Sequence, residues 1–329
     1  MKHIKWGIIG PGKIANKFAV ALTLAGGASL EAVASRDGSK AREFAEKYGA
    51  RRSYDNYESL AADPDIDAIY VATPHGFHLE HTLLCLQHGK PVLCEKPMAL
   101  YAAQVESMVA ASTSNKVFLM EAMWARFVPN MEKILELIRD GQLGTIKYIR
   151  ADFGFKGPYS PDNRLFNLAL GGGSLLDIGI YPLFLCLQIL GKPDLIVASG
   201  HLAPTSADES CHAILQYTGD NGGSTAIISS SFACQTSVTA EIAGTEGMIQ
   251  IPTSWHRSDK LTLIRPGEEP KTFQVEPLVN GFEYQIREVA RCLENGWIES
   301  PLMSHDFSLT MSRTMDAIRR QIGVKYPGE

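Results

Sequence analysis

The chain has 329 residues, a length that corresponds to about two domains of ordinary size. Hydrophobic residues make up 45% and charged residues 20% of it, which is typical of a globular protein and excludes extensive disorder. The net charge of −5 does not favour binding to nucleic acid or to an anionic membrane. We find no apolar run of the roughly 18 residues that a membrane span requires, and no signal-peptide core. The six scattered cysteines indicate neither disulfides nor a metal site, so we expect a cytoplasmic protein.

Short apolar runs alternate with helical patterns over the first third of the chain. Strands are expected at residues 5–9, 30–35, 67–72, 91–94 and 116–120, and helices at 14–24, 39–48, 79–87 and 101–112. Strands separated by helices in this way indicate βαβ units and a parallel sheet. We predict an α/β domain with a doubly wound parallel sheet over residues 1–122.

Strands dominate after residue 123. After a helix at 130–139, strands are expected at 146–155, 195–201, 210–217, 223–232, 237–243, 248–251, 260–264 and 272–275, and helices at 282–294 and 307–322. A hairpin turn is expected at residues 218–222. We predict an α+β domain over residues 123–329 with a large, open, mainly antiparallel sheet, whose final helix could pack back on the first domain.

The first strand leads into Gly10-Pro11-Gly12-Lys13-Ile14-Ala15, which fits the pattern GxGxxA. The first glycine permits a tight turn, the second lets the backbone approach a pyrophosphate, and Ala15 allows the helix to pack closely on the sheet. The pattern alone would also suit a purely structural turn. Placed at the first βα turn, it predicts dinucleotide binding by residues 10–14.

The end of the second strand selects between cofactors. NAD sites carry an acid there for the ribose hydroxyl, whereas this chain has Ser35 and Arg36, which suit a 2′-phosphate. Asp37 is either the acid of a shifted register or a turn residue, and Lys40 could add positive charge. NADP is therefore expected, with NAD possible.

Two further segments suggest chemistry. Glu95-Lys96-Pro97 follows a buried strand, where the proline fixes the loop, although a solvated Glu–Lys pair would look the same. Three glycines at 171–173 precede Ser174, and a helix that begins there would place Asp177 and Tyr181 on one face. The alternatives are a capping aspartate and a core tyrosine, and Pro182 predicts a kink.

Together, GxGxxA, Glu95-Lys96-Pro97 and the segment GGGSLLDIGIY at 171–181 resemble the Gfo/Idh/MocA oxidoreductase family. The segment MEAMWARF at 120–127 is similar to its branch of dimeric dihydrodiol and NADP-dependent D-xylose dehydrogenases. The resemblance spans essentially the whole chain, although most of the family has histidine where this chain has Tyr181. It implies a Rossmann domain and an open-faced sheet domain, with cofactor and substrate between them.

The resemblance also implies roles for individual residues. Lys96 and Tyr181 would flank the reacting carbinol and Asp177 would orient them, because a nearby ammonium favours the phenolate of a tyrosine whose reference pKa is about 10. Further cofactor contacts are expected from Thr73, Pro74, His75, His78 and Glu95, and substrate contacts from Trp124, Arg126, Phe153 and Arg164. The histidines could instead be structural and the aromatic residues could belong to the core.

The sequence thus predicts an NADP-dependent dehydrogenase that acts on a vicinal diol or an aldose. The alternatives are a glycosidase that uses NAD for a transient oxidation, and a ligand-binding regulator on the same fold. The strands 226–232 and 238–242 do not alternate cleanly between apolar and charged residues. With the family resemblance, this pattern predicts a homodimer joined through the sheet face.

Overall fold

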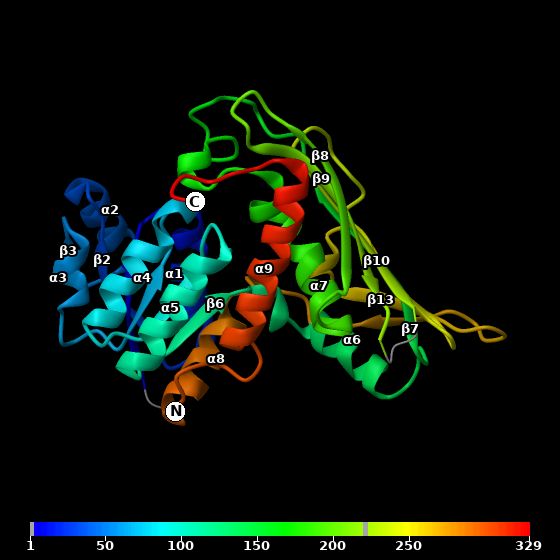
Figure 1. The fold of residues 1–329 in the computed structure, drawn as a ribbon. Helices are drawn as coiled ribbons and strands as arrows, with labels where there is room; N and C mark the ends of the chain where they lie inside the picture. The colour runs from blue at the N-terminus through cyan, green and yellow to red at the C-terminus, as the bar shows by residue number, and fades with distance from the viewer. Residues whose placement is uncertain (1–2, 220–222) are drawn as a thin grey trace. The chain divides into compact units, whose positions relative to one another are not determined.

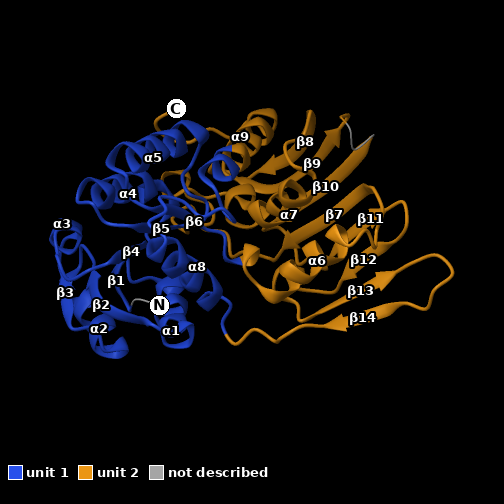
Figure 2. Ribbon diagram, turned by 90° about the horizontal axis from the view of Figure 1, so that it is seen from below, with its two compact units in different colours: residues 1–124, 280–309 blue, residues 125–279, 310–329 orange. Residues whose placement is uncertain are grey.

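The computed structural model describes residues 3–219 and 223–329, so the predicted turn at 218–222 lies largely outside the described residues. The chain forms two compact units (Figure 2). Unit 1 contains Met1–Trp124 and Asn280–Leu309, and unit 2 contains Ala125–Val279 and Thr310–Glu329.

Unit 1 is built on a parallel sheet. Its strands are β1 (Ile4–Ile9), β2 (Ala28–Ala34), β3 (Arg52–Tyr54), β4 (Ala68–Val71), β5 (Val92–Glu95) and β6 (Leu119–Ala122). They pair in the order β3-β2-β1-β4-β5-β6, every pair parallel. This is the doubly wound Rossmann order, which confirms the predicted fold class and places the topological switch point between β1 and β4.

Helices cover this sheet because each presents one apolar stripe to it. They are α1 (Lys13–Ala25), α2 (Gly38–Tyr48), α3 (Tyr57–Ala61), α4 (His78–Gln87) and α5 (Ala102–Asn115), and Figure 1 labels them. A further helix of unit 1, α8 (Glu283–Glu294), packs on α1. On α1, Phe18 is fully buried, stacks on Tyr70 of β4 at 3.7 Å between ring centroids, and meets the edge of Trp6 at 5.2 Å. This aromatic cluster fixes α1 on the sheet.

The predicted division after residue 122 differs from the observed units, because residues 280–309 join unit 1. The reason is that α8 packs on α1. Arg287 donates to the carbonyls of Ala25 and Leu24 at 3.0 and 2.8 Å, which satisfies main-chain acceptors at the end of α1. The final helix, α9 (His305–Ile322), begins in unit 1, where His305 lies 3.0 Å from the carbonyl of Leu119, and continues in unit 2.

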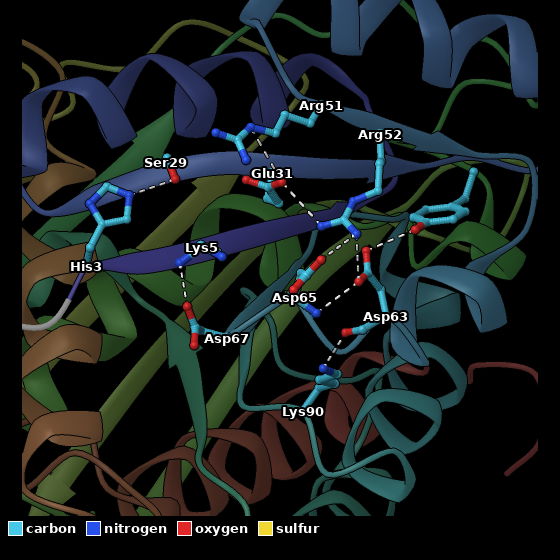
Figure 3. A network of polar contacts seen from close by, with 11 residues as sticks. His3, Lys5, Ser29, Glu31, Arg51, Arg52, Asp63, Asp65, Asp67 and Lys90 are labelled. Atoms are coloured by element: carbon cyan, nitrogen blue, oxygen red, sulfur yellow. Dashed lines mark hydrogen bonds and ion pairs between the residues drawn. The ribbon is translucent and has the colours of Figure 1, made fainter.

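Sequence patterns missed β3 and α3, which are too short to show periodicity. Side-chain charges hold β3 in place (Figure 3). Arg52 lies 3.2 Å from Glu31, 3.1 Å from Asp63 and 3.0 Å from Asp65, so one guanidinium joins β3, β2 and the loop before β4. Lys90 extends this network by donating to the carbonyl of Asp63.

Unit 2 is built on a mainly antiparallel sheet. Its strands are β7 (Ile146–Gly154), β8 (Leu195–Leu202), β9 (Asp208–Tyr217), β10 (Ser224–Ser231), β11 (Ala240–Gly244), β12 (Met248–Ile251), β13 (Lys260–Ile264) and β14 (Lys271–Gln274). The order is β14-β13-β12-β11-β7-β10-β9-β8, with β7 and β10 parallel and the other pairs antiparallel. The helices α6 (Pro129–Arg139) and α7 (Ile180–Leu190) lie over one face (Figure 2). The predicted open sheet is thereby confirmed.

The helix α7 forms the core of unit 2, and it packs on β7 and β10. By length and composition alone the helical stretch Leu168–Leu190 could cross a membrane, contrary to the expectation from the sequence. However, 89% of its most apolar window is buried inside the structure. Such burial is what the core helix of a globular protein shows, because its apolar surface is already covered.

Candidate functional site

The glycine turn after β1 lies at the switch point of the unit 1 sheet. Gly10 has φ +87°, and a Cβ there would stand 2.8 Å from Thr73 Cγ2 and 3.0 Å from Thr73 N. Only glycine therefore allows the turn after β1 to lie against the turn after β4. Ligands of doubly wound sheets bind at this edge.

The beginning of α1 fits a phosphate group. Gly12 is the N-cap, and within residues 3–219 and 223–329 no side chain caps this helix end. A Cβ on Gly12 would meet no atom of the described chain within 4 Å, so the space above the turn is open. Pro11, Lys13 and Ile14 lie around this end, where main-chain N–H groups and the helix dipole favour an anion.

Asp37 after β2 and Glu31 within β2 already have partners. Asp37 is the N-cap of α2, where its carboxylate accepts the N–H groups of Ser39 and Lys40 at 3.1 and 3.4 Å. Hydrogen bonds from Ser39 and Lys40 hold the pKa of Asp37 below its usual range. Lys40 also lies 3.6 Å from this carboxylate, and Glu31 binds Arg52. This capping role agrees with the second alternative, a turn residue, and Ser35 accepts the N–H of Asp37 at 3.2 Å.

Arg36 is exposed at the same edge and lies over the ring of Phe77, 5.4 Å from its centroid. The ring of Phe77 stacks in turn on His81 at 5.9 Å. Burial lowers the pKa of His81 to about 4, so this ring is neutral and adds no repulsion to the arginine. Phe77 thus supports a guanidinium at the edge that carries the glycine turn, and the sequence showed no signal for it.

The two histidines after β4 differ in environment. His78 is fully buried at the start of α4, with its ring nitrogens 2.8 Å from the carbonyls of Thr73 and Pro97. Burial lowers its pKa, although the hydrogen bonds to these carbonyls oppose this shift, and the ring joins the loops that follow β4 and β5. We assign His78 a positioning role. His75 is half-buried beside it, with 5.5 Å between the ring centroids, and Pro74 is exposed.

The loop after β5 carries Lys96, whose side chain is half-buried and whose peptide bond to Pro97 is cis. Glu95 before it is buried and accepts the hydroxyl of Tyr70. On the other side, the N–H of Met98 donates to Glu121 at 2.9 Å. Burial raises the pKa of Glu121 to about 7, although hydrogen bonds from Ser308 and Met98 oppose this shift. Two buried carboxyl groups therefore flank the lysine loop.

In unit 2 the segment after the three glycines is helical, but its first turn is not an α-helix. Leu175–Gly179 form a π-helical turn and α7 begins at Ile180. The cause is Pro182, which has no N–H to donate to Ile178 and whose ring would clash with that carbonyl. In place of the expected kink, the helix thus has a widened, π-helical turn before Pro182. Such π-turns occur frequently at functional sites.

Asp177 lies in this π-turn, 7% exposed, and Arg164 holds it by both carboxylate oxygens. Each of the two Nη···Oδ distances is 3.3 Å. The side chain of Arg164 is 56% exposed, so its other N–H groups remain accessible. Pairing at two points fixes the plane of the carboxylate.

Tyr181 lies within a group of rings from three parts of unit 2. Phe153 at the end of β7 is 5.6 Å away and His256 is 5.3 Å away, and these two stack on each other at 4.7 Å between centroids. Trp255, fully buried, donates from Nε1 to the carbonyl of Asp152 at 3.0 Å and so anchors the turn that carries His256. Sequence reasoning missed His256, because nothing in the local pattern relates it to Tyr181.

The remaining candidates have structural partners. Trp124 packs against Phe282 at 5.5 Å between ring centroids, within unit 1. Arg126 is 5% exposed and its Nη1 lies 2.5 Å from Glu132 in the first turn of α6. We therefore expect Arg126 to stabilise the start of this helix rather than to contact a substrate.

Comparison with known families agrees with this geometry. Residues 4–123 match the oxidoreductase family with an NAD-binding Rossmann fold, and residues 131–250 match the GFO/IDH/MocA C-terminal domain. The chain is 41% identical over 339 residues to trans-1,2-dihydrobenzene-1,2-diol dehydrogenase of Xenopus tropicalis, covering 98% of this chain and 99% of the relative. For the enzyme of that name from Homo sapiens, the identity is 37% over 337 residues, covering 98% of each chain.

Solved structures show the same architecture. Aldose-aldose oxidoreductase from Caulobacter crescentus, complexed with glycerol, has a TM-score of 0.88 at 26% identity, covering 98% of this chain and 97% of that one. A 3-ketoreductase from Actinomadura kijaniata, in complex with NADP and TDP-benzene, has a TM-score of 0.86 at 25% identity, covering 98% and 99%. The chain therefore belongs to the Gfo/Idh/MocA family of oxidoreductases, as its motifs predicted, and is an NAD(P)-dependent dehydrogenase.

Proposed function

We propose that the protein is an NADP-dependent dehydrogenase that oxidises the carbinol of a vicinal diol or an aldose, of the trans-dihydrodiol or D-xylose type. The observation that carries this proposal is its similarity over 98% of its length to relatives named as dihydrodiol dehydrogenases. The aldose-aldose oxidoreductase among the similar structures supports the wider class of sugar substrates.

The preference for NADP rests on the edge of β2. Arg36 is exposed and supported by Phe77, while Asp37 caps α2 and Glu31 binds Arg52. A guanidinium binds a 2′-phosphate well, whereas NAD requires an acid for its ribose. Ser35 adds a hydroxyl, and Lys40 adds charge that Asp37 partly offsets. The open turn at Gly12 and the uncapped start of α1, as described above, suit the pyrophosphate.

For the chemical step, Tyr181 would accept the proton of the carbinol hydroxyl at its phenolic oxygen. A phenol with a pKa of about 10 is a poor base near neutral pH, and the ammonium of Lys96 would favour the phenolate. When bound, the nicotinamide supplies the acceptor for the hydride that leaves the same carbon. Asp177, fixed by Arg164, would orient the reacting groups.

Substrate binding would use the polar and aromatic groups next to Tyr181. The free N–H groups of Arg164 suit sugar or diol hydroxyls, and the faces of Phe153 and His256 suit the C–H surface of a ring. Trp124 remains a candidate for substrate binding. The six cysteines, all among the described residues, are free thiols, which supports a cytoplasmic location.

A homodimer fits the outer face of the unit 2 sheet. Val197, Ile214 and Ile227 lie in one row across β8, β9 and β10, with Val197 52% and Ile214 39% exposed. The row continues into Arg150 and Glu241 on β7 and β11. An apolar strip beside charged residues on an open sheet face suits a second copy of the chain.

The test is a substrate panel followed at 340 nm with NADP and with NAD. It includes a trans-1,2-dihydrodiol, D-xylose, a hexose and a simple glycoside. Net formation of NADPH with a diol or an aldose is the expected result. Redox-neutral cleavage of the glycoside would instead indicate a glycosidase. Cofactor binding without turnover of any substrate would indicate a ligand-binding regulator.

A further inference from the structure

The second and third glycines of the triplet, Gly172 and Gly173, pack closely against other parts of the protein. A Cβ on Gly172 would lie 2.7 Å from Asn167 N. Gly173 has φ +130°, and a Cβ there would lie 2.3 Å from Asp208 Oδ1 and 3.0 Å from the hydroxyl of Tyr326. The glycines thus bring the main chain against Asp208 and Tyr326 immediately before the π-turn.

Asp208 lies at the start of β9, far from the π-turn in sequence, and its side chain caps the beginning of that turn. Its Oδ2 accepts the N–H of Leu175 at 2.7 Å and the hydroxyl of Ser174 at 2.8 Å. Ser174 also lies 2.9 Å from the hydroxyl of Ser230 on β10, so the beginning of the turn is joined to two strands. Asp208 is 1% exposed, and among the described residues its Oδ1 has no hydrogen-bond partner. A buried carboxylate in this position supplies the cap that the turn lacks in its own sequence.

Tyr326, near the end of the chain, also contacts the main chain of the glycine triplet. Its hydroxyl donates to the carbonyl of Gly172 at 2.9 Å. Its own N–H donates to the Glu329 carboxylate at 3.1 Å, and Arg319 of α9 pairs with that carboxylate and lies over the tyrosine ring at 5.8 Å. The last residues of the chain are therefore folded against the glycine triplet.

We propose that Asp208 and Tyr326 are positioning residues for the reaction, which hold the π-turn so that Asp177 and Tyr181 keep their directions. The proposal rests on the proposed function, since it assumes that these two residues act on the substrate. Asp177 is three residues beyond Ser174, and its N–H donates to Gly173 at 3.2 Å. Loss of the hydrogen bonds to Asp208 would therefore directly change the position of Asp177.

The cap depends on charge. Burial raises the pKa of Asp208 to about 6, against the hydrogen bonds from Leu175 and Ser174. The titratable groups that interact with it are Tyr326 and Cys211, whose pKa values burial raises and which stay neutral near pH 7. Protonation below about pH 6 weakens Asp208 as an acceptor, so the turn is best held above that pH.

The experiment compares the full-length variants Asp208→Asn and Tyr326→Phe with matched controls. Asp194→Asn alters another aspartate that accepts an N–H and a hydroxyl, both from Thr218. Tyr217→Phe removes a hydroxyl from a buried tyrosine that has no hydrogen-bond partner among the described residues. Asparagine keeps an acceptor oxygen but does not titrate, and phenylalanine removes one hydroxyl, so folding should survive in both.

At saturating substrate and NADP, we expect kcat to fall by about 10- to 100-fold in the two test variants, as for misplaced catalytic groups, with little change in NADP affinity. The acid limb of the kcat–pH profile near pH 6 should disappear in Asp208→Asn alone. Hydrogen exchange in the peptide 172–181 should become faster in both test variants and stay unchanged in the controls. A kcat within twofold of the wild type together with unchanged exchange would overturn the proposal. If the wild-type protein oxidises no diol or aldose while exchange responds as expected, the proposed function has failed instead.

Discussion

Arg164 and Asp177 form a two-point ion pair within unit 2, with one partner mostly exposed and the other buried. The pair links the loop after β7 to the π-turn. It gives Asp177 a fixed plane, while the arginine keeps N–H groups accessible for a ligand.

Substitution of Arg164 should therefore affect chemistry more than folding. Arg164→Lys keeps the charge but cannot make two parallel hydrogen bonds, and Arg164→Met removes both. Since a hydrogen bond to a charged group contributes about 1.5–3 kcal/mol, we expect losses in kcat/KM of roughly 10-fold for lysine and roughly 100-fold for methionine. Steady-state kinetics with a diol at saturating NADP measure this, and melting temperatures check folding. Equal activity of the lysine variant and the wild type would contradict the role of the paired geometry.

Tyr181→Phe removes only the proposed proton acceptor. Turnover should fall by the roughly 10²–10⁴-fold typical of a lost general acid–base group, while NADP affinity stays nearly unchanged. Lys96→Met should be comparably damaging, and the double variant scarcely worse than either, because residues that act as a unit are not additive. Rates of the three variants at saturating NADP decide this. Near wild-type turnover by Tyr181→Phe would transfer the proton step to Lys96 or to a histidine such as His75.

Arg36→Ala tests the choice of cofactor. Loss of a charged hydrogen bond to the 2′-phosphate should weaken NADP binding by roughly 10- to 150-fold, and NAD binding far less. Lys40→Ala is the matched control, and it should have a smaller effect because Lys40 already pairs with Asp37. Titration of both cofactors into both variants measures the difference. An equal loss for NADP and NAD would show that Arg36 does not read the phosphate.

Glu121→Gln tests the buried carboxyl beside the lysine loop. The pKa of Glu121 rises from its ordinary 4.5 to about 7 in the folded protein, so the folded state binds the proton more tightly than the unfolded state. Its contribution to the free energy of unfolding is therefore present below pH 4.5 and is lost as the pH rises through about 7. Glutamine keeps the acceptor for the Met98 N–H without a charge.

We expect the glutamine variant to gain stability over the wild type between pH 5 and pH 8, by up to about 3 kcal/mol at the higher pH. Denaturant unfolding of both proteins at the two pH values measures this. Buried His78 and His81 shift stability in the opposite direction, but equally in both proteins. A difference in stability that does not change with pH would mean that Glu121 is not the titrating group.

The sheet face of unit 2 gives a prediction about assembly. Val197→Glu combined with Ile214→Glu places charges in the apolar row, so a dimer joined there should dissociate. Val279→Glu is the control, because Val279 is 78% exposed but lies outside the sheet strands. Light scattering at micromolar concentration should give a dimer for the wild type and the control and a monomer for the double variant. A monomeric wild type would rule out the dimer.

Much of the fold could be predicted because its signals are local. Alternating apolar strands and amphipathic helices indicate a parallel sheet through their periods, and Gly10 and Gly12 mark the cofactor turn through backbone geometry. Lys96 stood out because it follows a buried strand and precedes a proline, and Asp177 and Tyr181 stood out because they follow three glycines. Short elements such as β3 lack a period and were missed.

The environment of these residues depends on contacts between distant parts of the chain, which have no periodic signature. Arg164 reaches Asp177, His256 stacks beside Tyr181, and Asp208 caps the turn only because β7, β9 and the loop before β13 converge in the folded unit. Residues 280–309 join unit 1 for a similar reason, since Arg287 satisfies carbonyls that α1 leaves unpaired. The local sequence therefore identifies the candidate reactive groups, whereas packing between distant segments determines which partners orient them.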